Sequence, residues 1–465
     1  MTDTLIPAPS SAPTAKPAPA APRDYHFPKF EQRVLANGIR LLVAPVPKLP
    51  IATVLALVEA GASVEPQGKA GVAALTARLL PEGVQGMDGT ALADRFERIG
   101  ASVEASADWD VAAVTLTSLS GQIANALTLV RDLLRAPTFP EREVQRLKEE
   151  RLADLLQQLA EPRGLADDEF AKAVYTDSAR YAAPEGGSAD SVRGLTRDDV
   201  LAFYAARYQP GGVTLIFAGD ITMDVATSLT ESLFGDWTGT TPPPAASGID
   251  AAQPGTLVRI VAKADAPQSE LRVGHLGLCR NIPDYFDTMV MNAVLGGLFS
   301  SRINLNLREA HGYTYGASSA FDWRRGVGPF MVQTAVKSDV TGAAVQEILN
   351  EIERMRQAPI SDDELTLATS YLDGVFPIRY ETTAAIAAAL ANMVIHALEE
   401  NFFDTYRSKV RAVTSDGVLR AAQVHLHPTQ LRIVVVGDPA AVAVPLEAVT
   451  GTRPEIVAAN SGMAS

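Results

Sequence analysis

Short apolar runs alternate with longer patterns of helical period along this chain. "IRLLVAP" and "ATVLALV" are rich in β-branched and apolar residues, which is typical of strands. Leu92, Phe96 and Ile99 recur at the spacing of one helix face, after Asp88 as a potential N-cap. Two further runs, separated by the short "ADWD", predict a hairpin. The pattern predicts an α+β protein whose sheets are mostly antiparallel and carry helices on one face.

The same order of patterns occurs twice. The strand "VTLIFAGD" recurs as "LRIVVVGD", and the helix start "LTRDDVLAFY" recurs as "VTSDGVLRAA", each 218 residues further along. A third pair of helix starts, "APTFPEREV" and "QAPISDDEL", precedes these two anchors in each half. In the second of them, Ser361 and Glu364 predict a capping box. Three anchors in one order predict two tandem homologous domains.

Breaks in composition suggest where the domains end. Residues 1–27 are rich in Ala, Pro and Ser and lack the apolar core of a secretory signal, so we expect a disordered segment. Residues 239–255, "GTTPPPAASGIDAAQPG", predict a linker. We therefore expect a first domain over 28–238, a second over 256–455 and a short tail over 456–465.

Composition narrows the class of partner. The formal charge of −14 and the pI near 5.0 create a negative field that repels phosphate backbones, which argues against nucleic acid as a partner. No uninterrupted apolar run approaches the roughly 18 residues that a membrane-spanning helix needs, so we expect no membrane span. The cytoplasm is the expected location because no signal peptide is visible.

Residues that usually carry chemistry are scarce. The single cysteine, Cys279, excludes an internal disulfide, and we expect it to be buried in the strand "LRVGHLGLC". None of the six histidines stands in H-x-x-E-H or H-E-x-x-H. On a predicted strand, His425 and His427 would share a face and could chelate a metal, although surface histidines are the simpler interpretation. Neither a G-x-S-x-G elbow nor a phosphate loop occurs.

One stretch, "NLREAHGYTYGASSAF", suggests a reaction. Arg308 carries five donors and Tyr315 one phenolic donor. Gly312 between them allows the chain to reverse, so both side chains could converge on one point. Two converging donors suit a carbonyl oxygen and, if that oxygen gains charge, an oxyanion site. The spacing alone leaves open a surface arginine followed by core-facing tyrosines.

At these residues the chain resembles the pitrilysin/insulinase family of zinc metallopeptidases, the inverzincins. It is most similar to the branch of two-domain bacterial and mitochondrial-processing-peptidase subunits. "LGGLFSSRINLNLREAHGYTYGASS" resembles the glycine-rich loop of that branch, followed by its Arg/Tyr pair. The resemblance implies that substrate contacts come from Gly296, Gly297, Arg308, Tyr313 and Tyr315.

The family carries H-x-x-E-H on a helix of its first domain and a third zinc ligand, a glutamate, on a later helix. The matching stretch here is "GVAALTARLL", with Ala74 at the first histidine, Ala77 at the catalytic glutamate and Arg78 at the second histidine. Zinc in such a site needs imidazole and carboxylate ligands. We therefore expect no metal and no cofactor on this chain. Glu149 and Glu150 lie near the third-ligand position and are expected to be ordinary helix-surface charges.

Members of this branch pair two subunits around a closed chamber. The resemblance therefore implies a zinc-lacking subunit of a heteromeric zinc metalloendopeptidase that cleaves peptides. Arg308 and Tyr315 would serve a zinc site in a homologous H-x-x-E-H partner, in a heterodimer or a higher-order assembly, and the isolated chain would be inactive. Two alternatives stay open: a non-catalytic structural or peptide-binding subunit of core-protein type, and a homodimer that captures peptides at an exposed sheet edge.

Overall fold

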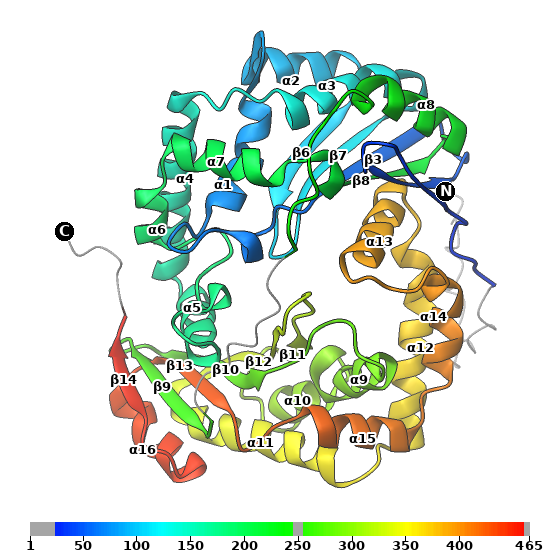
Figure 1. The fold of residues 1–465 in the computed structure, drawn as a ribbon. Coiled ribbons are helices and arrows are strands. Elements are labelled where there is room, and N and C mark those ends of the chain that lie inside the picture. The colour runs from blue at the N-terminus through cyan, green and yellow to red at the C-terminus, as the bar shows by residue number, and fades with distance from the viewer. Residues whose placement is uncertain (1–23, 245–253, 460–465) are drawn as a thin grey trace, which may run out of the picture.

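The computed structural model describes residues 24–244 and 254–459, which form two halves that lie one above the other in Figure 1. Each half is built on a six-stranded sheet. The first sheet contains β1 (Glu31–Val34), β2 (Arg40–Pro45), β3 (Ile51–Val58), β6 (Ser102–Ala107), β7 (Ala112–Leu119) and β8 (Val213–Gly219). The second contains β9 (Leu257–Ala262), β10 (Gln268–Leu276), β11 (Ala317–Phe321), β12 (Pro329–Lys337), β13 (Arg432–Gly437) and β14 (Glu455–Ala458). A small hairpin, β4 (Gly83–Val84) and β5 (Met87–Asp88), lies apart from both.

Helices follow the strands in both halves. Those of the first half are α1 (Val72–Leu79), α2 (Gly89–Arg98), α3 (Ile123–Arg135), α4 (Glu141–Ala160), α5 (Pro162–Val174), α6 (Ala189–Gly194), α7 (Arg197–Arg207) and α8 (Met223–Phe234). Those of the second half are α9 (Tyr285–Asn292), α10 (Arg302–Asn304), α11 (Thr341–Gln357), α12 (Asp362–Arg379), α13 (Thr383–Ile395), α14 (Phe402–Arg411), α15 (Ser415–His425) and α16 (Pro439–Thr450). The predicted α+β class is confirmed.

The strand order shows that the two sheets are copies of one arrangement. The first sheet runs β1-β2-β8-β3-β7-β6 and the second runs β14-β9-β13-β10-β12-β11. Five positions therefore correspond one to one, with antiparallel pairing except at β2–β8 in the first sheet and at β9–β13 and β9–β14 in the second. This confirms the predicted tandem repeat. The copies differ at one edge, where β1 comes from the start of the first half and β14 extends the second sheet into the predicted tail.

Local capping explains several helix starts. Asp88 accepts a hydrogen bond from Ala91 N at 2.8 Å and starts α2, as predicted. Ser361 and Glu364 form the predicted capping box at α12. The predicted hairpin around "ADWD" is the antiparallel pair β6–β7. These elements depend on contacts between residues close in sequence, which explains why the pattern alone finds them.

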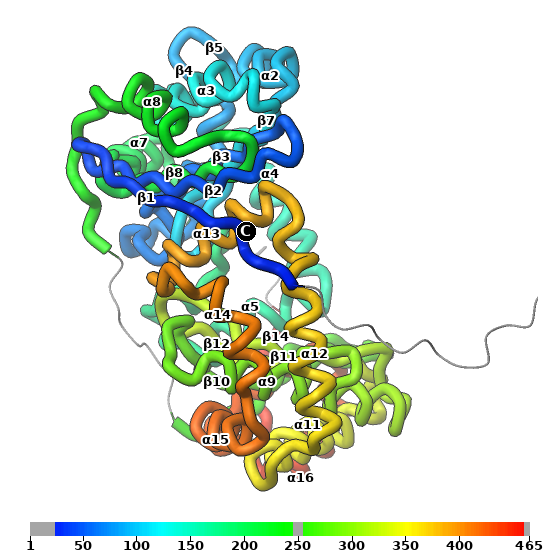
Figure 2. The backbone as a smooth tube through the Cα atoms, turned by 90° about the vertical axis from the view of Figure 1, so that its right-hand side faces the viewer, coloured from blue at the N-terminus to red at the C-terminus, as the bar shows by residue number. Residues whose placement is uncertain are grey.

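One helix from each half covers the sheet of the other half. In Figures 1 and 2, α13 lies under the first sheet, and α5 lies on the second sheet in Figure 1. Ile386 of α13 belongs to the same buried cluster as Leu55 and Ile216 of the first sheet. Phe170 of α5 is buried with Val434 of the second sheet. Each sheet therefore has the predicted helices on one face and, in addition, one helix from the other half on its opposite face.

A buried arginine fixes one side of this exchange. Arg272, on β10, has no exposed side-chain surface. Its Nε donates to Asp167 of α5 at 2.6 Å, and its Nη1 donates to Glu270 at 2.7 Å. Nearby, the Nε of Arg432 donates to the carbonyl of Ala173 at 2.9 Å. Because a buried guanidinium is tolerated only with such partners, these bonds hold α5 in one position on the second sheet.

The last residues of the predicted N-terminal segment pack against the second half. Phe27 is buried, and its ring stacks on Phe403 of the second half at a centroid distance of 4.2 Å. The hydroxyl of Tyr25 donates to the carbonyl of Tyr380 at 3.1 Å. The expectation of disorder is therefore wrong for these last residues of the 1–27 segment, and residues 1–23 lie outside the described residues, as do 245–253 of the predicted linker and 460–465 of the tail.

Two expectations about single side chains are wrong. β10 ends at Leu276, so Cys279 lies beyond the strand and is only half-buried. His425 is the last residue of α15 rather than part of a strand, and its Nε2 lies 2.7 Å from Asp284 Oδ2. His425 and His427 therefore do not share a strand face, and because His425 is buried, the simpler interpretation of a surface histidine is wrong for it. Within the described residues no helix combines the length and apolarity needed to cross a membrane.

We expect Arg272→Met to lower the free energy of unfolding by about 3 kcal/mol, because Glu270 would keep a buried charge without its closest partner. Urea denaturation measures this change. The double change Arg272→Met/Glu270→Leu should recover part of the loss. Arg142→Met, at a side chain that is 91% exposed, is the control and should change stability by less than about 0.5 kcal/mol. Equal effects of Arg272→Met and Arg142→Met would contradict the role of the buried arginine.

Candidate functional site

The degenerate zinc-motif positions lie on α1, whose start is fixed by a buried carboxylate. Glu65 has no exposed side-chain surface and accepts hydrogen bonds from Gly71 N at 3.0 Å and Ala73 N at 2.8 Å. Arg180 Nε donates to the same carboxylate at 2.5 Å. Burial raises the pKa of Glu65, and the guanidinium of Arg180 opposes that shift. The carboxylate of Glu65 therefore satisfies two backbone N–H groups at the start of α1.

The three motif positions have very different surroundings. Ala74 is half-buried, and Ala77 is fully buried in the core of the first half. Arg78 points its guanidinium at α4, where Nη2 lies 2.5 Å from Glu150 Oε1. Glu150 is therefore an ion-pair partner of α1 rather than only a solvated charge. Glu149 is exposed, as expected.

A cavity of about 490 Å³ opens beside Ala74. Its walls include Arg78, Arg151 of α4 and Glu185. Arg151 Nε donates to the carbonyl of Gly186 at 3.2 Å, and a Cβ at that glycine would lie 3.0 Å from the guanidinium. Burial, helped by the nearby charge of Asp108, raises the pKa of Glu185 from 4.5 to about 7. This cavity therefore contains a carboxyl group that titrates near neutral pH.

The glycine-rich segment lies in the second half, after α9. Gly296 is buried, and a Cβ there would collide with Ser319 of β11. Gly297 is exposed. Phe299, just beyond, is 71% exposed. Close packing against β11 thus accounts for Gly296, and the segment that follows it presents an aromatic side chain to solvent.

Arg308 lies in the short helical segment Leu305–Ala310. Its guanidinium carbon lies 4.6 Å from the centroid of the Phe299 ring, and its Nε is 3.4 Å from Glu309 Oε1. Tyr313 is half-buried and stacks on His311 at 4.9 Å. The alternative that the tyrosines of this stretch face the core therefore holds in part for Tyr313.

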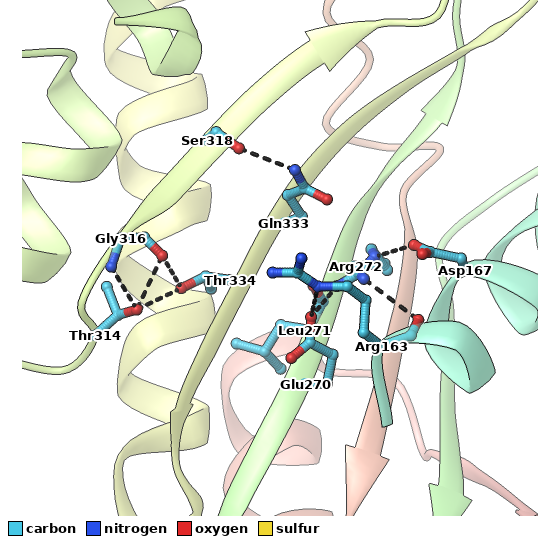
Figure 3. Close-up of polar contacts among 10 residues, drawn as sticks. All are labelled: Arg163, Asp167, Glu270, Leu271, Arg272, Thr314, Gly316, Ser318, Gln333 and Thr334. Atoms are coloured by element: carbon cyan, nitrogen blue, oxygen red, sulfur yellow. Dashed lines mark hydrogen bonds and ion pairs between the residues drawn. The ribbon is translucent and has the colours of Figure 1, made fainter. Parts of the chain in front are cut away.

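Tyr315 lies in a turn before β11 rather than in a strand, and it is 96% exposed. Figure 3 shows the hydrogen bonds that hold this turn. Thr314 Oγ1 accepts from Gly316 N at 3.1 Å and donates to Gly316 O at 2.9 Å. Thr334 of β12 donates to Thr314 Oγ1 at 3.0 Å. No hydrogen bond joins Arg308 to Tyr315 in the described part of the chain, so their convergence on one substrate atom stays a prediction.

A second cavity, of about 620 Å³, brings most of these residues together. Gly296, Gly297 and Tyr315 line it. Arg308 is not among the lining residues, but it packs on Phe299, which is. Arg163 also lines it, although this residue belongs to the first half. Arg163 was not predicted as a site residue because no local pattern in the sequence reveals that α5 crosses to the second sheet.

Two family models match consecutive parts of the chain. "Insulinase (Peptidase family M16)" matches residues 42–180, and "Peptidase M16 inactive domain" matches residues 194–372. The chain belongs to the M16 peptidase family. The first match lies within the first half, and most of the second match lies within the second half. This division agrees with the repeated architecture.

Similar M16 proteins come from distant sources. A crystal structure described as a peptidase M16 inactive domain from Pseudomonas fluorescens is 27% identical, covers 89% of this chain and 99% of its own, and superposes with a TM-score of 0.83. An uncharacterized zinc protease of Streptomyces coelicolor is 22% identical over 84% of this chain and 85% of its own length. A probable mitochondrial-processing peptidase subunit beta of Arabidopsis thaliana is 21% identical over 91% of this chain and 82% of its own length.

The α1 positions of this M16 member do not fit a zinc ion. Two methyl groups cannot ligate a cation, and the guanidinium of Arg78 occupies the carboxylate of Glu150. Among the described residues no group of three or more His, Cys, Asp or Glu side chains could hold a metal. The chain is therefore an M16 protein without the zinc-site residues.

We expect the purified chain to contain no stoichiometric zinc, even after incubation with zinc and removal of the excess, because Ala74, Ala77 and Arg78 offer no ligand. Metal analysis by mass spectrometry measures this. A homologue with an intact H-x-x-E-H motif, treated in the same way, is the positive control. One tightly bound zinc ion per chain would contradict the prediction.

We expect Glu185→Gln to raise the melting temperature relative to the natural chain by an amount that depends on pH. Because the folded state raises the pKa of Glu185 from 4.5 to about 7, ionisation destabilises the folded protein. The difference should be absent below pH 4.5, grow as pH rises toward 7 and stay constant above it. Glu149→Gln, an exposed carboxylate on α4, is the matched control. A pH-independent difference for Glu185→Gln would contradict the prediction.

Proposed function

We propose that this chain is the zinc-lacking subunit of a heteromeric M16 metalloendopeptidase that cleaves peptides. Its partner is a homologous subunit with H-x-x-E-H, which would supply a zinc-bound water as nucleophile. This chain supplies Arg308 and Tyr315 to the substrate carbonyl. Membership of a peptidase family, together with the loss of every motif side chain at Ala74, Ala77 and Arg78, supports a division of labour between two chains.

The observation that carries the proposal is the presentation of Tyr315. A tyrosine that is 96% exposed, on a turn braced by hydrogen bonds from Thr314 and Thr334, has little to contribute to the fold of its own chain. Tyrosine is enriched at interfaces because it combines a large apolar ring with a hydroxyl donor. The adjacent cavity gives room for a peptide next to that hydroxyl.

The chemistry of the two side chains suits amide hydrolysis. When water adds to a peptide carbonyl, the oxygen gains negative charge, and donors placed at that oxygen lower the barrier. Arg308 is 35% exposed, and its ion pair with the exposed carboxylate of Glu309 is a long contact of 3.4 Å. Exchanging this contact for a substrate oxygen costs little free energy. The phenol of Tyr315 is already free of hydrogen bonds within the described residues.

A relative named as a peptidase subunit adds support for assembly. The Arabidopsis protein is described as subunit beta of a processing peptidase, and it aligns over most of this chain. We infer that the present chain also works as one subunit of such an assembly. We place this assembly in the cytoplasm, the location expected from the sequence.

A second candidate function is a non-catalytic structural or peptide-binding subunit. One observation favours it: the guanidinium of Arg308 packs over Phe299 and faces Glu309, and within the described part of the chain it makes no hydrogen bond to Tyr315. In that case the cavity would hold a peptide without taking part in its cleavage. The two candidates differ in whether removal of these donors changes turnover.

We expect Arg308→Ala and Tyr315→Phe each to lower the turnover of the heteromer at least about tenfold, because each removes a donor from the developing oxyanion. The pair is obtained by co-expression with an H-x-x-E-H homologue, and cleavage of an unstructured fluorogenic peptide measures turnover. Size-exclusion chromatography checks that the subunits stay associated.

Matched controls test whether position matters rather than residue type. Tyr371→Phe changes a tyrosine of α12 that is 51% exposed, and Arg142→Ala changes an exposed arginine of α4. Both should leave turnover unchanged. Unchanged turnover in Arg308→Ala and Tyr315→Phe as well would reject the catalytic role and favour the second candidate.

A further inference from the structure

Arg163 brings a positive charge from the first half into the cavity of the second half. It is the second residue of α5, and its backbone carbonyl accepts a hydrogen bond from Arg272 Nη2 at 3.4 Å. The backbone of Arg163 is thus tied to β10. In Figure 3 its side chain extends from α5 over Glu270 toward Gln333 and Thr334, which line the same cavity.

The donors of Arg163 are largely unused. Its side chain is 76% exposed, and its ion pair with Glu270 is long, with 3.7 Å between Nε and Oε1. Arg272 lies much closer to Glu270, at 2.7 Å, and is the main partner of that carboxylate. The guanidinium of Arg163 makes no hydrogen bond within the described residues. Two parallel N–H groups are therefore free for a planar anion.

The rest of the cavity wall is neutral. Of the side chains that line it, only Arg163 and Glu270 carry a charge. Gln333 Nε2 donates to Ser318 Oγ at 3.2 Å, which leaves the hydroxyl hydrogen of Ser318 available to a ligand. A cationic ligand group would be repelled by Arg163 and would find Glu270 already engaged by Arg272. A carboxylate would meet the donors of Arg163 and Ser318, while the charge of Glu270 is paired with Arg272.

We propose that Arg163 is the anion-binding side chain of this cavity and that the cavity prefers peptides that place a carboxylate in it. The inference rests on the proposed function insofar as the ligand is a peptide. The carboxylate comes either from an acidic side chain or from a free C-terminus, since a guanidinium binds both in the same bidentate geometry. Arg163 is thus a specificity-determining residue that the exchange of α5 delivers to the other half.

The test uses the full isolated chain and four short fluorescein-labelled peptides of one unstructured sequence. The peptides carry Glu or Gln at one internal position and end in a free carboxylate or an amide. Fluorescence anisotropy measures Kd. We expect the Kd of the fully neutral peptide to be about tenfold higher than that of its best carboxylate-bearing counterpart, as for a hydrogen-bonded charge pair. The Glu/Gln and acid/amide comparisons identify which source of carboxylate is bound.

Variants of the chain assign the effect to one side chain. Arg163→Gln should reduce the discrimination to less than about twofold, and Arg163→Lys should keep part of it, because lysine preserves the charge but not the bidentate fork. Arg142→Gln is the matched control, since Arg142 is 91% exposed and also has one long ion pair, 3.8 Å to Glu143. It should discriminate as the natural chain does.

Three results would overturn the proposal: equal Kd values for charged and neutral peptides, undiminished discrimination in Arg163→Gln, or no saturable binding of any of the four peptides. None of these measurements involves a partner subunit or cleavage. Failure of the proposed function is seen separately, in the turnover of the heteromer with Arg308→Ala and Tyr315→Phe.

Discussion

The reciprocal exchange of α5 and α13 is the constraint on which the rest of the molecule depends. Each helix covers an apolar face of a sheet that its own half does not contain, so neither half has a complete core alone. On the α5 side the contact also includes a fully buried guanidinium, Arg272, whose partners come from both halves. Apolar burial supplies the attraction, and the directional bonds of Arg272 determine where along the sheet the helix lies.

The two cavities differ in the charge of their walls, and the exchange accounts for one part of that difference, the presence of Arg163 in the second cavity. In the first half, the guanidinium of Arg78 lies 2.5 Å from the carboxylate of Glu150, so these two charges between α1 and α4 compensate each other. In the second half, the glycine-rich segment and the braced turn of Tyr315 surround an open, mostly neutral cavity to which Arg163 adds one cation. The wall of the first cavity therefore carries several charged side chains of both signs, whereas the wall of the second carries only Arg163 and Glu270.

The features that the sequence predicts well are those decided by neighbouring residues. The face of Leu92 and Phe96, the capping box at Ser361 and the two copies of the sheet follow from local periodicity and turn chemistry. The ion pair of Arg78 with Glu150 and the reach of Arg163 were not predicted, because they join residues far apart in the chain. Cys279 was misplaced for a local reason: its strand ends three residues earlier, where β12 stops pairing with β10.

The stacking of Phe27 on Phe403 has a practical meaning for anyone who shortens this protein. The residue precedes the first strand and contributes nothing to the hydrogen bonding of either sheet, yet its ring covers an aromatic group of the far half. A truncated version that starts at β1 would uncover the rings of Phe403 and Tyr380 and leave an aromatic patch open to self-association. A safe cloning boundary therefore lies upstream of Tyr25.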